Sequence, residues 1–136
     1  MIFFNVPEAR QQLVTKGFVY TLRPKMRRTG EDVAVYGSYF KHERIGDVSI
    51  QFIKEVTGIT DIIEYVSSSG FAKAEDWWKA ANGSKFLFRV VLLEAVEAWT
   101  KTQDPHWLTV DELKAICRKK GLPDSGNKED LIRRLK

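Results

Sequence analysis

The stretch "LTVDELKAICRKKGLPDSGNKEDLIRRLK", residues 108–136, ends the chain with two short helical patterns. Thr109 is followed three residues later by Glu112, a spacing in which the hydroxyl caps the Glu112 amide and the carboxylate reaches back. Basic residues fill the last turn of this first pattern, where cations complement the helix dipole. Gly121 can adopt the left-handed conformation that ends a helix, and Pro123 prevents continuation. The sequence therefore predicts a capped helix that stops near residue 120.

A second helix is predicted to begin near Asn127, a good N-cap with Asp130 three residues on. The residues "DSGN" before it are predicted to form a tight turn. Nine apolar side chains belong to the pair: Leu108, Val110, Leu113, Ile116, Cys117, Leu122, Leu131, Ile132 and Leu135. Nine apolar groups would stabilise an isolated helical pair only marginally. We therefore expect the pair to pack on a neighbouring part of the protein or on a ligand.

The segment "GLPDSGNKEDLIRRL" within residues 108–135 resembles the SAP motif, a DNA-binding helical element of about this length. The resemblance implies contacts to the backbone and minor groove of duplex DNA, from the turn and the start of the second helix. By position, the implied contact residues are Ser125, Gly126 and Lys128, with Lys119 and Lys120 nearby. Asn127 stands where a second lysine is common, so one phosphate contact is lost there. Independently, Lys128 opposes the helix dipole in a first turn, a placement that a bound anion would explain.

Charge is concentrated in two basic stretches of a chain of 136 residues with a net charge of +4. Residues 108–136 hold 8 Lys+Arg and 5 Asp+Glu, and residues 15–30 hold five basic residues and no acid. Basic patches of this kind suit nucleic-acid phosphates, although each could simply be a solvated surface. With one cysteine, no long apolar run and no basic leader, we expect no disulfide, no membrane segment and a cytosolic or nuclear location, nucleoid-associated in a bacterium.

The first 97 residues alternate short strand and helix patterns. Strands are predicted at 18–23, 32–40, 47–56 and 85–99, and helices at 6–17, 59–71 and 73–82. The last strand is almost continuously apolar, which predicts burial on both faces. The fold class expected is α+β, with a small barrel over residues 1–97, a linker over 98–107 and the helical pair over 108–136. Trp99 and Trp107 are expected to hold the helices against the barrel.

Residues 8–95 also resemble the ASCH domain of the PUA-like superfamily, through "KGFVYTLRPKMRRTGEDVAVY", "IGDVSIQFIKEV", "SSSGFAKAEDWW" and "FLFRVVLLE". That family's Gly, Lys, Thr or acid, Arg signature is matched here by Thr21 and Arg23. Lys16 and Phe18 stand where glycine and lysine are expected, and Ser69 stands where an acid is expected. The resemblance therefore implies a PUA-like barrel with a binding pocket at Thr21 and Arg23. It argues against the nucleoside hydrolysis that some relatives perform, since Phe18 cannot act as a base.

The predicted barrel site is a basic cleft for RNA, a single strand or a modified base. Its residues are Thr21, Arg23, Lys25, Arg27 and Arg28. An arginine can form paired hydrogen bonds with a phosphate or a base edge, but Arg23 could instead pair with Glu31 or Asp32. Candidates for stacking on a base are Tyr36, Tyr39 and Trp77, although a core position for Trp77 is the stronger expectation.

Catalytic and metal-binding patterns are missing from the sequence. His42 and His106 lie far apart and match no metal-ligand spacing, and His42 has no paired carboxylate to orient it as a base. Cys117 falls on an apolar helix face, where burial favours an inert thiol. We therefore expect a nucleic-acid-binding protein without cofactors. The alternatives are an ASCH-type ribonuclease or nucleoside hydrolase, and an adaptor that binds a protein through residues 64–78.

Overall fold

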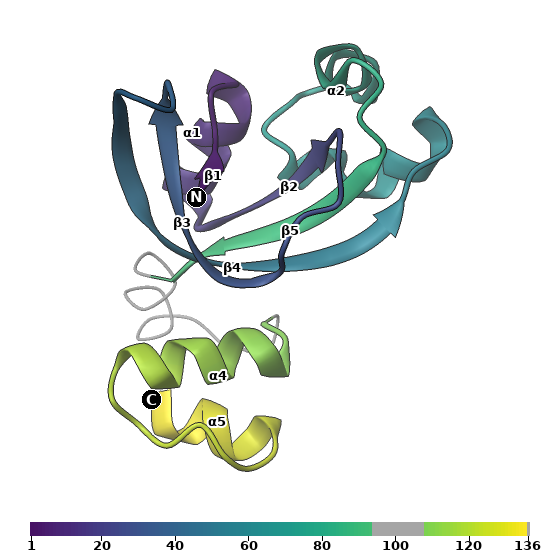
Figure 1. Cartoon of the computed structure of the whole chain (residues 1–136). Helices are drawn as coiled ribbons and strands as arrows, with labels where there is room; N and C mark the ends of the chain where they lie inside the picture. Colours follow the sequence, from purple (N-terminus) through teal and green to yellow (C-terminus); the bar gives the residue numbers. More distant parts are fainter. Residues whose placement is uncertain (94–107, 136) are drawn as a thin grey trace.

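A computed structural model describes residues 1–93 and 108–135, and within these ranges the chain is α+β (Figure 1). Five strands form one sheet in the order β1-β3-β4-β5-β2. The strands are β1 (Ile2–Phe3), β2 (Phe18–Arg23), β3 (Gly30–Gly37), β4 (His42–Glu55) and β5 (Phe86–Leu92). All neighbours pair antiparallel except β1, which runs parallel to β3. The sheet is strongly curled, so that it forms a half-barrel whose edge strands are β1 and β2.

Strand β5, which lies between β4 and β2, carries side chains into three separate apolar clusters. Phe88, Val90 and Leu92 point into the interior of the half-barrel beside Ile2, Phe4 and Leu13. Leu87 packs with Trp77 and Ile62, and Val91 packs with the C-terminal helices. Leu87, Phe88, Val90 and Val91 are fully buried, so the predicted burial of this strand on both faces is confirmed.

All four predicted strands are present, three of them with shifted ends. β2 has the predicted bounds, whereas β3 stops at Gly37 and β4 begins at His42 rather than residue 47, because the two strands continue pairing up to the turn at residues 38–41. β5 ends at Leu92 and Leu93 is helical, so the prediction of a strand reaching residue 99 is wrong at Leu93. The two-residue strand β1 was not predicted. Residues 94–107, including the predicted linker with Trp99 and Trp107, lie outside the described ranges.

Three short helices cover the half-barrel. α1 (Pro7–Lys16) begins at a proline and ends at Gly17, whose φ of 85° provides the left-handed stop that the sequence predicts. The 3-10 helix η1 (Ile59–Ser68) and α2 (Ala74–Ala81) enclose a small core under the open side of the sheet. Trp77 is buried in this core, as expected for one of the two adjacent tryptophans.

The C-terminal helices α4 (Val110–Lys119) and α5 (Lys128–Leu135) lie below the convex face of the sheet (Figure 1). Their joint core includes Val91 and Leu93 from the half-barrel, so the helical pair packs against the rest of the protein as predicted. The connector is not a tight turn: residues 120–127 cross back along the pair, and the two helices run side by side in the same direction. Gly121, Pro123 and Gly126 keep this connector extended, because none of them continues a helix readily.

Candidate nucleic-acid interface

Both ends of α4 confirm the capping pattern read from the sequence. The Glu112 amide donates to Thr109 Oγ1 at 3.2 Å, and the Thr109 amide donates to Glu112 Oε1 at 3.0 Å. At the other end of α4, the Leu122 amide donates to the Cys117 carbonyl at 2.8 Å around Gly121. These bonds satisfy terminal backbone groups that would otherwise face the core.

The connector presents three exposed residues, Ser125, Gly126 and Asn127, immediately before α5. The Asp130 amide donates to Asn127 Oδ1 at 2.9 Å, which fixes the first turn of the helix. Arg134 holds the connector from below by donating to the carbonyls of Pro123 and Ser125. The surface that the SAP resemblance implicates is therefore rigid before any ligand arrives, which lowers the entropic cost of binding.

Gly126 adopts a φ of +106° beside the carboxylate of Asp130. A Cβ at this position would lie 2.8 Å from Asp130 Oδ2, so only glycine fits. Gly126 is exposed and has no side chain, which allows close approach of a phosphate. Lys128 follows in the first turn of α5, where it is half-buried.

The two other predicted cations of this element differ in their surroundings. Lys119 Nζ lies 2.7 Å from Asp47 Oδ2 on β4, so the half-barrel already engages this charge. The bond from Lys119, opposed by partial burial and reinforced by Arg44, lowers the pKa of Asp47 below its usual value. Lys120 lies at the C-terminal end of α4, half-buried and at the start of the connector.

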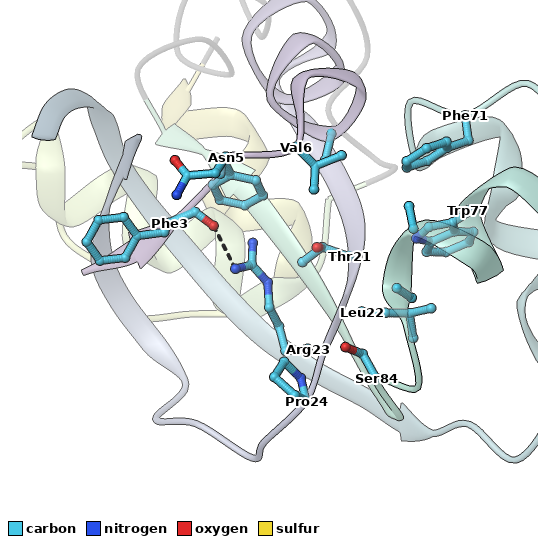
Figure 2. Close-up of a pocket in the computed structure, with 14 residues that line it drawn as sticks. Phe3, Asn5, Val6, Thr21, Leu22, Arg23, Pro24, Phe71, Trp77 and Ser84 are labelled. Carbon is cyan, nitrogen blue, oxygen red and sulfur yellow. Dashed lines mark hydrogen bonds between the residues drawn. The ribbon is translucent and has the colours of Figure 1, made fainter. Parts of the chain in front are cut away.

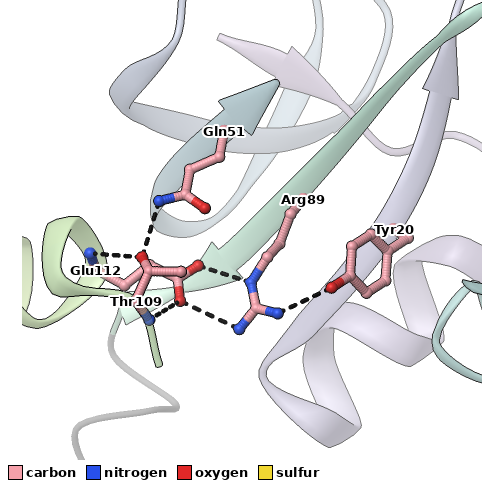
Figure 3. Close-up of polar contacts among 5 residues, drawn as sticks. All are labelled: Tyr20, Gln51, Arg89, Thr109 and Glu112. Atoms are coloured by element: carbon pink, nitrogen blue, oxygen red, sulfur yellow. Dashed lines mark hydrogen bonds and ion pairs between the residues drawn. The ribbon is translucent and has the colours of Figure 1, made fainter. Parts of the chain in front are cut away.

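A buried ion pair that the sequence reading did not find locks α4 to the sheet (Figure 3). Arg89 Nε lies 2.8 Å from Glu112 Oε2, and Arg89 Nη2 lies 3.1 Å from Glu112 Oε1. A third nitrogen, Nη1, donates to the Tyr20 hydroxyl at 2.9 Å. Burial lowers the pKa of Arg89, but the bonds to Glu112 and Tyr20 outweigh it, so the pKa is raised overall. Glu112 thus serves as helix cap and as counterion at once.

The ion pair could have been suspected from one sequence feature. Arg89 is the only charge in the apolar run 86–93, and a buried arginine requires an acidic partner. Glu112 was fully explained as a cap, so nothing local identified it as that partner. Gln51 adds a further tie, since its side chain donates to Thr109 Oγ1 at 2.8 Å.

The second candidate site is a pocket of about 250 Å³ between the two edge strands of the half-barrel (Figure 2). Thr21 and Arg23 line it from β2, and Phe3 and Phe4 line it from the opposite edge. α2 and the residues beside it close the pocket through Trp77 and Ser84. The pocket exists because β1 and β2 do not pair, which leaves a gap in the barrel wall.

Arg23 bridges this gap. Its Nη1 donates to the Phe3 carbonyl at 2.6 Å, and its guanidinium lies over the Phe4 ring, 4.8 Å from the centroid. Arg23 Nε is buried, and among the described residues it has no hydrogen-bond partner. Burial, together with the nearby charge of Arg27, lowers the pKa of Arg23 to about 10. No carboxylate of the described residues pairs with Arg23, so the predicted alternative of a pair with Glu31 or Asp32 is not seen.

The remaining predicted cations lie on the loop that follows the pocket. Arg27 Nη2 lies 3.0 Å from Asp32 Oδ2 and is half-buried, whereas Lys25 and Arg28 are exposed at the loop surface. The structure therefore brings Thr21 and Arg23 together in the pocket and leaves Lys25 and Arg28 outside it. Arg27 mainly stabilises the loop.

The remaining residues singled out in the sequence are His42, His106 and Cys117. Within residues 1–93 and 108–135, no group of three or more metal-ligating side chains comes together. His42 is exposed on β4 with Nδ1 against the Tyr39 carbonyl, and Cys117 is fully buried. His106 lies outside the described residues. None of the helices described has the length and apolar content that crossing a bilayer requires.

Comparison with known proteins identifies one part of the chain. The family model of the SAP domain matches residues 104–136. The SAP domain is a nucleic-acid-binding module, so this match supports DNA binding by the C-terminal helices. No curated protein and no solved structure matches the chain.

Proposed function

We propose that the chain binds duplex DNA through its C-terminal helices, with phosphate and minor-groove contacts from the connector and the start of α5. The match to the SAP domain over residues 104–136 carries this proposal. Ser125, Gly126 and Lys128 are its central contact residues, and Lys120 is a second phosphate partner. Lys119, held by Asp47, chiefly positions α4. Binding of this kind would place the protein at a nucleoid or in a nucleus.

We further propose that residues 1–97 form a PUA-like, ASCH-type domain, that 98–107 link it to the helices at 108–136, and that its pocket takes an unpaired or modified base. The buried Arg23 favours this function, because its Nε is a donor without a partner in a pocket with aromatic walls. A base offers carbonyl and ring-nitrogen acceptors on one edge and an apolar face for Phe71, a half-buried aromatic residue of the pocket lining. Lys25 and Arg28 on the adjoining loop would hold the flanking phosphates of RNA or single-stranded DNA.

The duplex proposal is tested with the full chain and labelled duplex DNA, by fluorescence anisotropy over a series of salt concentrations. Affinity should fall steeply with salt, because binding releases counterions from the phosphates. Lys128→Ala should weaken binding to all duplex sequences alike and reduce the magnitude of the salt slope by about 1. The matched control is Lys79→Ala on α2, an exposed lysine at the far end of the molecule (Figure 1). Equal affinities of the two variants, or no duplex binding at low salt, would refute the proposal.

Deleting the helices would be a poor version of this test. Removal of residues 108–136 takes away Glu112 and leaves the buried charge of Arg89 without its counterion. An unpaired buried charge is strongly destabilising. A loss of binding after truncation would therefore report an altered half-barrel as much as a lost contact, and point variants at exposed residues avoid this.

The pocket is tested by closing it. Ala80 lines the pocket and is exposed on α2, so Ala80→Trp adds a ring at the opening without changing any charge. We expect this variant to lose affinity for single-stranded RNA and to keep its affinity for duplex DNA. Ala72→Trp, at an exposed residue that does not line the pocket, is the control. Unchanged RNA binding in Ala80→Trp would exclude the pocket as the site.

A further inference from the structure

The turn between β3 and β4 is a rigid projection. The Ser38 amide donates to the Lys41 carbonyl at 2.9 Å, and the Lys41 amide donates back to the Ser38 carbonyl at 3.2 Å. The Asn5 side chain clamps Gly37 from both sides, accepting from its amide at 2.7 Å and donating to its carbonyl at 2.9 Å. Gly37 has a φ of +114°, and a Cβ there would lie 2.7 Å from the Lys41 carbonyl oxygen. The turn is therefore tightly specified by residues that do not contact its tip.

This rigid turn holds two aromatic side chains in solvent. Phe40 is 95% exposed and Tyr39 is 70% exposed, which makes them the most exposed large apolar residues in the described ranges. Their rings contact each other edge to face, with centroids 5.4 Å apart and planes at 86°. Neither ring contributes to the three cores, so folding gains little from them. Exposed apolar groups on a fixed support are typical of a surface that binds something.

The residues around the two rings indicate which kind of partner the tip binds. Ser38, Lys41 and His42 flank the tip, and all are exposed and polar or basic. Protein interfaces bury a broad patch with an apolar centre. The two rings of this tip are instead flanked by polar and basic residues. A pair of exposed aromatic rings flanked in the sequence by basic residues instead matches the pattern by which proteins stack on bases and hold the adjoining phosphate.

We propose that the Tyr39–Phe40 tip is a stacking platform for unpaired nucleobases of a single strand that extends from the duplex held by the C-terminal helices. The turn between β3 and β4 lies at the end of the half-barrel away from α4 and α5, so this strand must run along the half-barrel to reach the tip (Figure 1). The proposal rests on the proposed duplex binding. Because the two rings meet edge to face, each supports the other and an outward face remains for one base. An unpaired base is the favoured partner, since stacking on it requires no base pair to be broken.

α4 is tied to the half-barrel near both of its ends, so the tip and the helices keep a fixed separation. Lys119 of α4 contacts Asp47 on β4, and Arg44 contacts the same carboxylate at 2.9 Å, between Asp47 and the tip. The buried pair of Arg89 and Glu112 fixes the other end of α4. A fixed separation between two contacts raises the effective concentration of the second once the first has formed.

The test compares the full chain on a blunt duplex and on the same duplex carrying a 3′ or a 5′ single-stranded overhang that contains 2-aminopurine and is long enough to run the length of the half-barrel. We expect an overhang to tighten binding and to change the 2-aminopurine emission. Phe40→Ala should lose roughly 5- to 100-fold in affinity for overhang DNA and should bind the blunt duplex like the wild type. Phe40→Trp should retain the overhang preference. Ile63→Ala, another exposed apolar residue on η1, is the matched control.

The outcomes separate the two proposals. If blunt-duplex binding is normal and Phe40→Ala equals Ile63→Ala on overhang DNA, the stacking platform is refuted while duplex binding stands. If the blunt duplex does not bind, duplex binding fails, and any Phe40-dependent single-strand binding then stands alone. Exposed aromatic residues can also insert into a lipid surface, and flotation with phosphatidylcholine and phosphatidylserine vesicles tests this alternative. Vesicle binding that needs Phe40, with unchanged overhang binding, would reassign the tip to a lipid surface and overturn the proposal.

Discussion

At the scale of single residues, Glu112 combines two structural roles. It caps α4, and it neutralises Arg89 in a site where its own side chain is fully buried (Figure 3). Two charges in a buried pair cost desolvation energy, and the pair is tolerated because its hydrogen bonds are complete. For the same reason, substitution of either partner should destabilise the protein, because it leaves the other charge buried and unpaired. Arg23 is the opposite case, since its Nε is buried and has no hydrogen-bond partner among the described residues, a feature that a bound ligand would explain.

We expect Glu112→Gln to lower the free energy of unfolding by about 3 kcal/mol. Glutamine preserves the side-chain shape and can still cap the helix, so the loss isolates the missing negative charge beside Arg89. Urea unfolding followed by circular dichroism measures it. Asp111→Asn, an exposed acid in the same helical turn, is the control and should cost no more than about 1 kcal/mol. A similar loss in both variants would show that Arg89 does not depend on Glu112.

At the scale of elements, two features can be tested by their effect on stability: the ends of the helices, and the ion pair between Lys119 of α4 and Asp47 of β4. α1 and α4 are both followed by glycines with positive φ, Gly17 and Gly121. These stops could be predicted because capping depends on residues within one turn of the chain. The tie through Lys119 and Asp47 could not, because β4 and α4 are brought together only by the fold.

Gly121→Ala should destabilise the protein by about 1 kcal/mol, since an alanine must pay for a left-handed conformation. No atom lies within 4 Å of the Cβ that would be added, so the effect is conformational rather than steric. Gly58→Ala is the matched control, because Gly58 is equally open but extended, with a φ of −167°. Thermal unfolding of both variants decides the matter. A destabilisation of Gly58→Ala as large as that of Gly121→Ala would contradict the left-handed stop.

The tie to β4 should make stability depend on acidity. Bonding to Lys119 and Arg44 lowers the pKa of Asp47, so the folded state binds the proton less readily than the unfolded state. The stabilisation is therefore present above the usual aspartate pKa of about 3.9 and is lost as the pH falls below it. Asp47→Asn should show a smaller loss of stability than the wild type between neutral and acidic pH. Parallel losses in the two proteins would mean that the tie contributes nothing.

At the scale of the whole molecule, the helical pair and the half-barrel share a core. Val91 and Leu93 of the half-barrel pack among Leu113, Ile116 and Leu131 of the helices. An element with few apolar groups of its own gains stability by such sharing. The chain should consequently unfold as one cooperative unit rather than as two independent parts.

Cys117 provides the measurement of this cooperativity. It is the only cysteine in the chain, it is fully buried between the helices, and burial raises the pKa of its thiol, so a thiol reagent should not reach it in the folded state. Its labelling should begin at the same urea concentration at which circular dichroism reports loss of the sheet and the other helices. Labelling at clearly lower urea would show that the helical pair opens by itself.

The sequence by itself determined the elements whose instructions are local. The capping box at Thr109, the stop at Gly121, the cap at Asn127 and the alternation in β2 act over two to four residues, and all were predicted correctly. The SAP match, which carries the proposed DNA binding, lies in that same locally readable segment.

Only the tertiary structure decided how these elements meet. The strand β1, the partnership of Arg89 with Glu112 and the gap that forms the Arg23 pocket all join residues at least 20 positions apart, as in the bond from Arg23 to Phe3. No periodicity or cap encodes such pairs, because they depend on sheet curvature and on which edges fail to pair. The same holds for the tip. The sequence made Tyr39 a candidate for stacking but placed it, with Phe40, in a predicted strand, and only the closed turn puts the two rings together in solvent.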